Sequence, residues 1–299
     1  MIRALKDGLR DALGHWPSAL LLFAAVAVPA GIVGYVFQAG FVSAFGRSAA
    51  LETLSEGFAF TTLFDLFTRE GFRLLPVLAM SLAFLVVSLP IHSFLTAGLV
   101  SALRERGTWS SRTYFAGAAQ HTGGFLVLSL LTLGIVLLIA TLTLAAAGFL
   151  FIDTENASNP GVLAILAFGI IMSACILTLG DYARSYLVQE PERGVFGSIR
   201  AAAEFLVTHA GGAAALTLFL AAASLLPLLG VVFFEDVVPH AVGGWLAPLV
   251  MVQQAAVILR SWVRVLAFAA QSSFIRTAHG TLRPGEEPST PSPFLTQGI

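Results

Sequence analysis

Charged residues and cysteine are both scarce in this chain, and each shortage excludes a class of protein. Only 11% of the 299 residues are charged, whereas a soluble domain carries roughly 25%. With 57% hydrophobic residues and a mean hydropathy of +0.86, the chain would not stay in water as a compact domain. The single cysteine, Cys175, excludes an intrachain disulfide and a multi-thiolate metal site.

Motifs with recognisable chemistry are also missing. The sequence holds no HExxH, no GxSxG and no phosphate-binding glycine loop. It has no Lys/Arg-rich run with interleaved aromatics, so nucleic acid is not an expected partner. These absences predict a non-catalytic protein without a cofactor or a bound metal.

Long apolar runs predict membrane-crossing helices, since about 20 residues at 1.5 Å each cover the hydrocarbon core of a bilayer. The first run is too long for the core of a cleaved signal peptide, so we read it as an uncleaved span. The predicted fold is an all-α, polytopic transmembrane bundle with one domain over residues 1–280. The six windows are Ala12 to Gly46, Leu74 to Leu103, Thr113 to Ile152, Asn156 to Gly180, Phe205 to Phe234 and Val237 to Leu259.

The distribution of charge predicts the orientation of these spans. With six crossings, the side that holds both termini carries 13 of the 16 basic residues, with nine acids. The opposite side carries three basic and eight acidic residues. Because cytoplasmic flanks retain Lys and Arg, we expect both termini in the cytoplasm of a bacterial inner membrane.

An internal repeat divides the chain into units of about 1–107, 108–194 and 195–280. A shift of 88 residues superposes Arg112 and His121 on Arg200 and His209, and a weaker third copy pairs Lys6 with His15. Each unit reads as a short amphipathic cytoplasmic helix, a hinge and two spans in parallel repeats. The first amphipathic helix carries Leu5, Leu9 and Leu13 on one face, which we expect in the lipid headgroup zone. The predicted hinge residues are His15, Pro17, His121, Gly123, Gly124, His209, Gly211 and Gly212.

Two segments depart from the repeat. Between Phe41 and Phe72, apolar residues at helical spacing predict a second interfacial helix, on the outer face, that either seals the bundle or serves as a lid or a partner-docking element. The tail over residues 281–299 is rich in Pro, Ser, Thr, Gly and Glu, so we expect it to be disordered.

Four ionisable residues near cytoplasmic helix ends are the candidate site: Asp181, Arg184, Arg260 and Arg264. One interpretation makes them interfacial anchors with an ion pair between Asp181 and an arginine. The other makes the arginines a basic pocket between helices that holds an anionic lipid headgroup or a phosphate.

Histidine recurs at equivalent places in the units, which raises a metal hypothesis. His15, His121 and His209 would need nitrogens converging to about 2.0 to 2.1 Å from one point to bind zinc. Nothing in their spacing predicts convergence, so hinge residues that cap local backbone are the favoured interpretation. His92 follows Pro90 inside the second span and is expected to bond between helices rather than to act as a ligand.

The segment from Ser198 to His209, followed by small residues and an apolar span, resembles a loose class of bacterial six-span proteins. That class includes the membrane domains attached to some glycerophosphodiester phosphodiesterases and the YciC-like inner-membrane proteins. The resemblance implies a membrane bundle with in-plane helices; it implies no hydrolysis, because no catalytic barrel has a counterpart here.

Two functional hypotheses remain open from sequence. The first is a lipid-interacting or scaffolding module whose partners are membrane lipids and an unidentified membrane protein. The second is a small permease or channel, which predicts a polar cavity between the spans.

Overall fold

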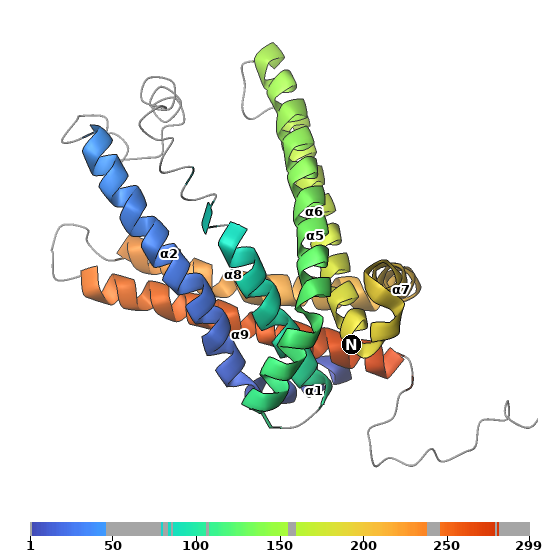
Figure 1. Ribbon diagram of the computed structural model, residues 1–299. Helices are drawn as coiled ribbons and strands as arrows, with labels where there is room; N and C mark the ends of the chain where they lie inside the picture. Colours follow the sequence, from blue (N-terminus) through green and yellow to red (C-terminus); the bar gives the residue numbers. More distant parts are fainter. Residues whose placement is uncertain are drawn as a thin grey trace, which may run out of the picture.

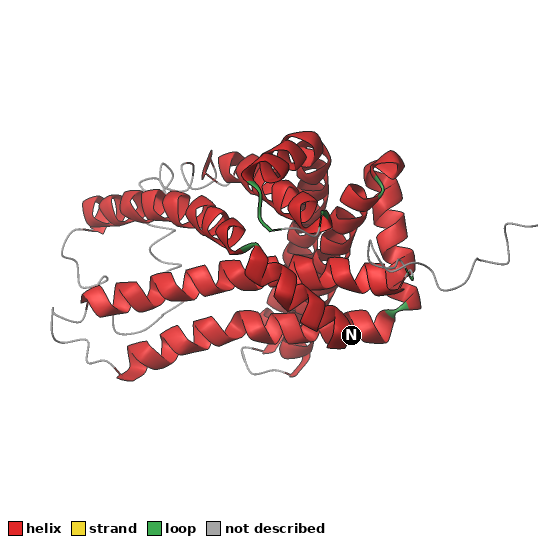
Figure 2. Cartoon of the chain, turned by 90° about the horizontal axis from the view of Figure 1, so that it is seen from below, coloured by secondary structure: helices red, strands yellow, loops and turns green. Residues whose placement is uncertain are grey.

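The computed structural model describes residues 2–45, 79, 83–84, 86–105, 108–154, 160–237, 246–278 and 280. Across this part of the chain, all regular structure is helical (Figure 2). The predicted all-α class is confirmed for these residues. The outer interfacial helix predicted around Phe60 to Phe67 and the tail 281–299 lie outside them.

Several of the helices are long and apolar, as in an integral membrane protein. Five described helices are long and apolar enough to cross a membrane, and α1 with α2, bent by 74°, supplies a sixth if the pair is one span. The elements are α1 (Ile2–Gly14), α2 (Trp16–Phe45), a helix over Val86–Arg104, α5 (Ser111–Thr154), α6 (Pro160–Gln189), the 3-10 turn η1 (Pro191–Arg193), α7 (Gly194–Thr208), α8 (Ala210–Val237) and α9 (Leu246–Ala278).

Two helices continue well past the predicted ends of their spans. The fourth window was expected to end at Gly180, but α6 runs to Gln189; the sixth was expected to end at Leu259, but α9 runs to Ala278. Each window ends next to a charged residue, Asp181 in the fourth and Arg260 in the sixth; Asp181 is paired inside the protein, whereas Arg260 is exposed. A charge interrupts an apolar composition without interrupting helical hydrogen bonding.

Helix junctions lie at two of the three predicted hinges. His15 separates α1 from α2, and its Nδ1 donates to the carbonyl of Asp11 at 2.9 Å. His209 separates α7 from α8, and its Nδ1 lies 3.3 Å from the carbonyl of Phe205. In both cases the ring contacts a backbone carbonyl in the last turn of the preceding helix, and at the second junction the Phe205 carbonyl also accepts from the backbone N–H of His209.

The hinge predicted at His121, Gly123 and Gly124 is wrong as a helix break, because α5 is continuous from Ser111 to Thr154. Gly124 instead serves packing: a Cβ there would lie 2.6 Å from Leu187 of α6. Glycine inside an apolar helix is tolerated in membranes, since the backbone remains hydrogen-bonded within the segment. The segment around His121 therefore differs from the segments around His15 and His209, where one helix ends and the next begins.

The long helices are packed at one end and separate at the other. α5 lies along α6 and α8 lies along α9, and Figure 1 shows the two pairs leaving in different directions, with α2 on a third course. We call the convergent part the packed base: residues 4–22, 93–103, 114–132, 180–188, 198–220 and 261–275. The outer ends are residues 23–32, 133–150, 163–179, 221–234 and 250–260, whose large apolar side chains are mostly exposed.

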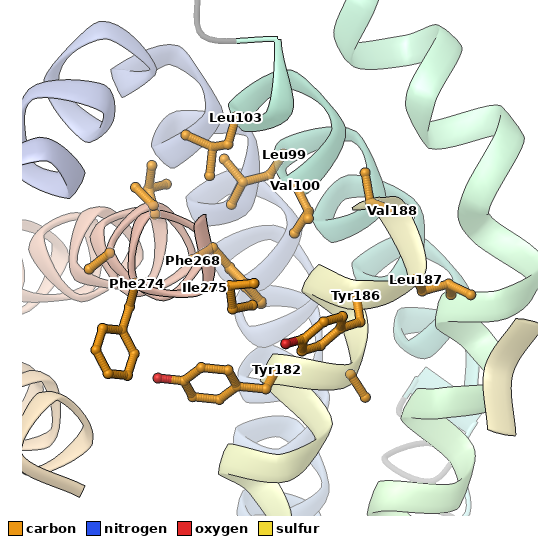
Figure 3. Packing of buried hydrophobic residues seen from close by; sticks show 14 of the residues in the cluster. Leu99, Val100, Leu103, Tyr182, Tyr186, Leu187, Val188, Phe268, Phe274 and Ile275 are labelled. Atoms are coloured by element: carbon orange, nitrogen blue, oxygen red, sulfur yellow. The ribbon is translucent and has the colours of Figure 1, made fainter. Parts of the chain in front are cut away.

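The centre of the packed base is the last part of α9. Its residues 261–275 are nearly all buried, and Val265, Phe268 and Ile275 are almost completely enclosed. Figure 3 shows Phe268 and Ile275 between Leu99 of the Val86–Arg104 helix and Tyr182 of α6. The segment that the sequence placed beyond the sixth span is thus the core of the fold.

The short helix α1 packs mainly through small residues, with Leu5 partly buried against the core. Ala4, Gly8 and Ala12 form the buried face against α9, and a Cβ on Gly8 would lie only 2.6 Å from the Cα of Ala270. Leu9 and Leu13 remain exposed beside this contact. Glycine at position 8 therefore sets how closely the two helices approach.

Candidate functional site

Three of the four predicted site residues meet in one ion cluster inside the packed base. Arg264 of α9 forms a bidentate ion pair with the Asp181 carboxylate: Nη1 donates to Oδ2 at 2.9 Å and Nη2 donates to Oδ1 at 2.8 Å. Arg184 donates to the same carboxylate, Nη1 to Oδ1 at 2.7 Å. Asp181 therefore pairs with two arginines, one on α6 and one on α9. The bidentate pair with Arg264 is the strong, directional form of an arginine–carboxylate interaction.

The cluster extends into two more helices through hydroxyl groups. Arg184 Nη2 donates to Ser129 Oγ of α5 at 3.2 Å, and Ser93 Oγ of the Val86–Arg104 helix donates to Ser129 Oγ at 3.2 Å. The guanidinium of Arg264 also lies 4.7 Å from the ring centroid of Phe268, a favourable cation–π distance. Four helices are therefore joined by one polar network at the level of Asp181.

A groove of about 770 Å³ opens beside this network, a size typical of small-molecule sites. It is lined by α2, α6, α8 and α9, with His92 contributed by the Val86–Arg104 helix. The side chain of Arg264 is 38% exposed whereas that of Arg184 is 10% exposed. Arg264 therefore lies on the groove surface, whereas Arg184 is buried behind it and is not part of the lining.

Arg260 lines the same groove but takes no part in the cluster. It is exposed, and no carboxylate within the described residues pairs with it. Along α9 the lining residues Arg260, Arg264, Ala267 and Gln271 follow one another at spacings of four, three and four, which places them on one helix face. This face carries two cations next to a cavity.

The lining of the groove changes in polarity along its length. It follows α9 from Gln253 to Gln271, about 27 Å at a rise of 1.5 Å per residue. Toward the outer ends it is mainly apolar, with Leu177, Leu228, Val231 and Val257. Toward the base lie Thr217 and Gln271, whose Oγ1 and Oε1 are enclosed without a hydrogen-bond partner in this structure.

The sequence identified all four charged candidates and placed Arg260 and Arg264 on the last helix, but it placed Asp181 and Arg184 after the fourth span, whereas they lie within α6. It missed Ser129, Thr217 and Gln271, which are ordinary residues on apolar helices. Continuing the helical spacing past Leu259 would have placed Gln271 on the face of Arg260 and Arg264. No comparable pattern marks Ser129, because its role depends on a helix packed against it.

The repeated histidines are not brought together as a metal site. Among the residues that the structure describes, no three His, Cys, Asp or Glu side chains lie close enough to hold a metal ion. His209 stacks on Phe205 at 4.6 Å between ring centroids and meets Phe274 edge-on. His15 and His209 thus act through backbone capping and packing.

Comparisons of the chain with protein-family models, with curated proteins and with solved structures found no match. The resemblance to six-span bacterial membrane proteins stays a prediction.

Proposed function

We propose that this chain is a non-catalytic integral membrane protein that binds an anionic lipid in the groove between α2, α6, α8 and α9. The headgroup lies against Arg260 and Arg264, and an acyl chain follows the apolar lining toward the outer ends. The chain would sit in the cytoplasmic membrane of a bacterium, with both termini and the packed base on the cytoplasmic side.

The observation that carries this proposal is the unpaired charge of Arg260. An arginine within a membrane helix is costly unless an opposite charge or water compensates it. Asp181 is already shared by Arg184 and Arg264, and it is the one acid among the described lining residues. A lipid phosphate supplies the missing negative charge and accepts hydrogen bonds from the guanidinium groups.

The shape of the groove supports a lipid over a small soluble anion. A soluble anion needs a polar enclosure on all sides, whereas most of this lining is apolar beyond the two arginines. An amphiphile matches both parts at once, because its headgroup meets the cations and its chain covers Leu177, Leu228 and Val231. Basic pockets between helices on the cytoplasmic side are a common place for anionic headgroups.

The test is native mass spectrometry of the detergent-purified protein, before and after mild delipidation, with dioleoyl phosphatidylglycerol added back. We expect retained anionic lipid, and an affinity about fivefold lower for Arg260→Ala, the loss expected for one basic contact near a membrane surface. Arg260 is the suitable target because replacing Arg184 or Arg264 would also expose Asp181.

Arg200→Ala is the matched control, since Arg200 lies on the exposed side of α7 and pairs with Glu204. It should bind lipid like the unaltered protein. Equal lipid binding by the Arg260→Ala variant would contradict the proposal. Displacement of the lipid by inorganic phosphate would assign the groove to a soluble anion instead.

A small permease is the second candidate function, because the groove between the long helices is lined by His92 and two arginines. Uptake of labelled inorganic phosphate into proteoliposomes, reduced by Arg260→Ala, would favour this candidate. Tight retention of phospholipid without uptake would favour the lipid-binding function.

A further inference from the structure

The described charges at the groove do not cancel. Arg184, Arg260 and Arg264 carry three positive charges, and Asp181 is the single acid that faces them. His92 is the other ionisable group on the lining, and the described lining residues of α2 and α8 carry no charge. The site therefore has a surplus of two positive charges.

We infer that the groove selects lipids whose headgroup is a phosphate monoester, of the phosphatidic acid type, over phosphodiester lipids. This inference rests on the lipid-binding function proposed above and names the headgroup. A phosphate monoester carries a charge of about −1.5 to −2 near neutral pH and three strong acceptor oxygens. A phosphodiester such as phosphatidylglycerol carries one negative charge, so it would leave half of the surplus uncompensated.

The spacing of the two groove arginines favours one doubly charged phosphate over two separate ones. Arg260 and Arg264 are four residues apart on one face of α9, where side chains start about 5–6 Å from each other. Two guanidinium groups that start at that separation can both donate to the oxygens of a single phosphate. A lipid with two linked phosphodiesters has the same total charge, but its charges are spread over two centres.

The ion cluster prepares Arg264 for this role. Asp181 accepts one hydrogen bond from each terminal nitrogen of Arg264, and an arginine has five N–H donors. The remaining three have no partner among the described residues, and the cation–π contact with Phe268 holds the group in place. Asp181 thus positions Arg264 without using all of its donors.

The experiment compares two ligands that differ by one methyl group. Dioleoyl phosphatidic acid and dioleoyl phosphatidylmethanol have the same chains, and the methyl ester removes one negative charge. In native mass spectrometry of the purified protein with equal amounts of both, we expect about a fivefold preference for phosphatidic acid, the effect of one additional charge contact. Arg260→Gln should bring the ratio close to one while both lipids still bind.

Arg200→Gln removes the same charge from the exposed side of α7, and it should leave the preference unchanged. Equal binding of the two ligands by the unaltered protein would overturn the inference while leaving anionic lipid binding intact. Stronger binding of cardiolipin than of phosphatidic acid would also overturn it, because it would show two phosphate positions. Absence of binding by every anionic lipid would overturn the proposed function, and the inference with it.

Discussion

The packed base and the outer ends are built from similar amino acids but are held together differently. In the base, side chains from several helices meet at buried aromatic residues, close glycine contacts and an ion cluster. In the outer ends, leucine, isoleucine and phenylalanine are mostly exposed, and the described hydrogen bonds there are mainly from a threonine or serine to its own helix. Similar apolar compositions therefore serve packing between helices in one region and leave side chains exposed in the other.

This difference shows why the groove lies where it does. Along α9, the residues before Ser261 are mostly exposed and those after it are mostly buried, and Arg260 and Arg264 stand on either side of that change. The proposed lipid at this boundary would contact the polar network with its headgroup and the separated apolar helices with its chain. The packed base positions the charged residues of the groove, and the outer ends provide its apolar lining.

The largest expected effect is the loss of the carboxylate that unites the base. Asp181→Asn leaves Arg184 and Arg264 without their shared counter-charge, and breaking a buried pair in this way costs about 3–5 kcal/mol. The measurement is thermal unfolding of the purified variant in the same detergent. Glu204→Gln makes the comparable change in an exposed ion pair on α7 and should leave the Tm almost unchanged. Similar Tm values for the two variants would show that the cluster does not stabilise the base.

The all-helical class and the long apolar helices could be predicted from composition. A long apolar run in a membrane protein is expected to form a helix, because a helix satisfies its backbone hydrogen bonds within the segment. The junctions at His15 and His209 could also be predicted from their repeat. The continuity of α5 could not be predicted, because it goes with the packing of Gly124 against Leu187 of α6. The extension of α6 and α9 could not be predicted either, because it goes with the pairing of Asp181 with arginines. The predicted orientation and threefold repeat stay predictions.

A smaller effect on stability is expected when two glycines, both inside helices, are compared by substitution with alanine. Gly8→Ala would place its Cβ 2.6 Å from the Cα of Ala270, so α1 must shift from α9, at a cost of about 1–3 kcal/mol. Gly31→Ala, in the outer end of α2, meets nothing within 4 Å and should gain slightly from the better helix propensity of alanine. The test is the difference in Tm between the two variants. An unchanged Tm for Gly8→Ala would mean that docking of α1 is not tight.

Within the site, the charged candidates were visible in sequence because a charge in an apolar helix is rare. Their arrangement was not, since the sequence left open whether Arg184, Arg260 and Arg264 acted as anchors or as a pocket. The structure pairs two of them with Asp181 and leaves Arg260 on the groove. Ser129 could not be selected, because a serine becomes informative only once the helix opposite it is known, whereas Gln271 could be reached by continuing the spacing of Arg260 and Arg264 along the helix.

The smallest expected effect compares two hydroxyl hydrogen bonds, one in each region. Tyr114 donates to the carbonyl of Leu95 at 2.7 Å and joins α5 to the Val86–Arg104 helix in the buried base. Tyr114→Phe removes this bond and should cost about 1 kcal/mol. Thr141 donates to Leu137 within α5, on the exposed outer end, so Thr141→Val should leave the Tm nearly unchanged because it breaks no contact between helices. A larger loss for Thr141→Val than for Tyr114→Phe would mean that the outer ends, rather than the base, limit the stability of the fold.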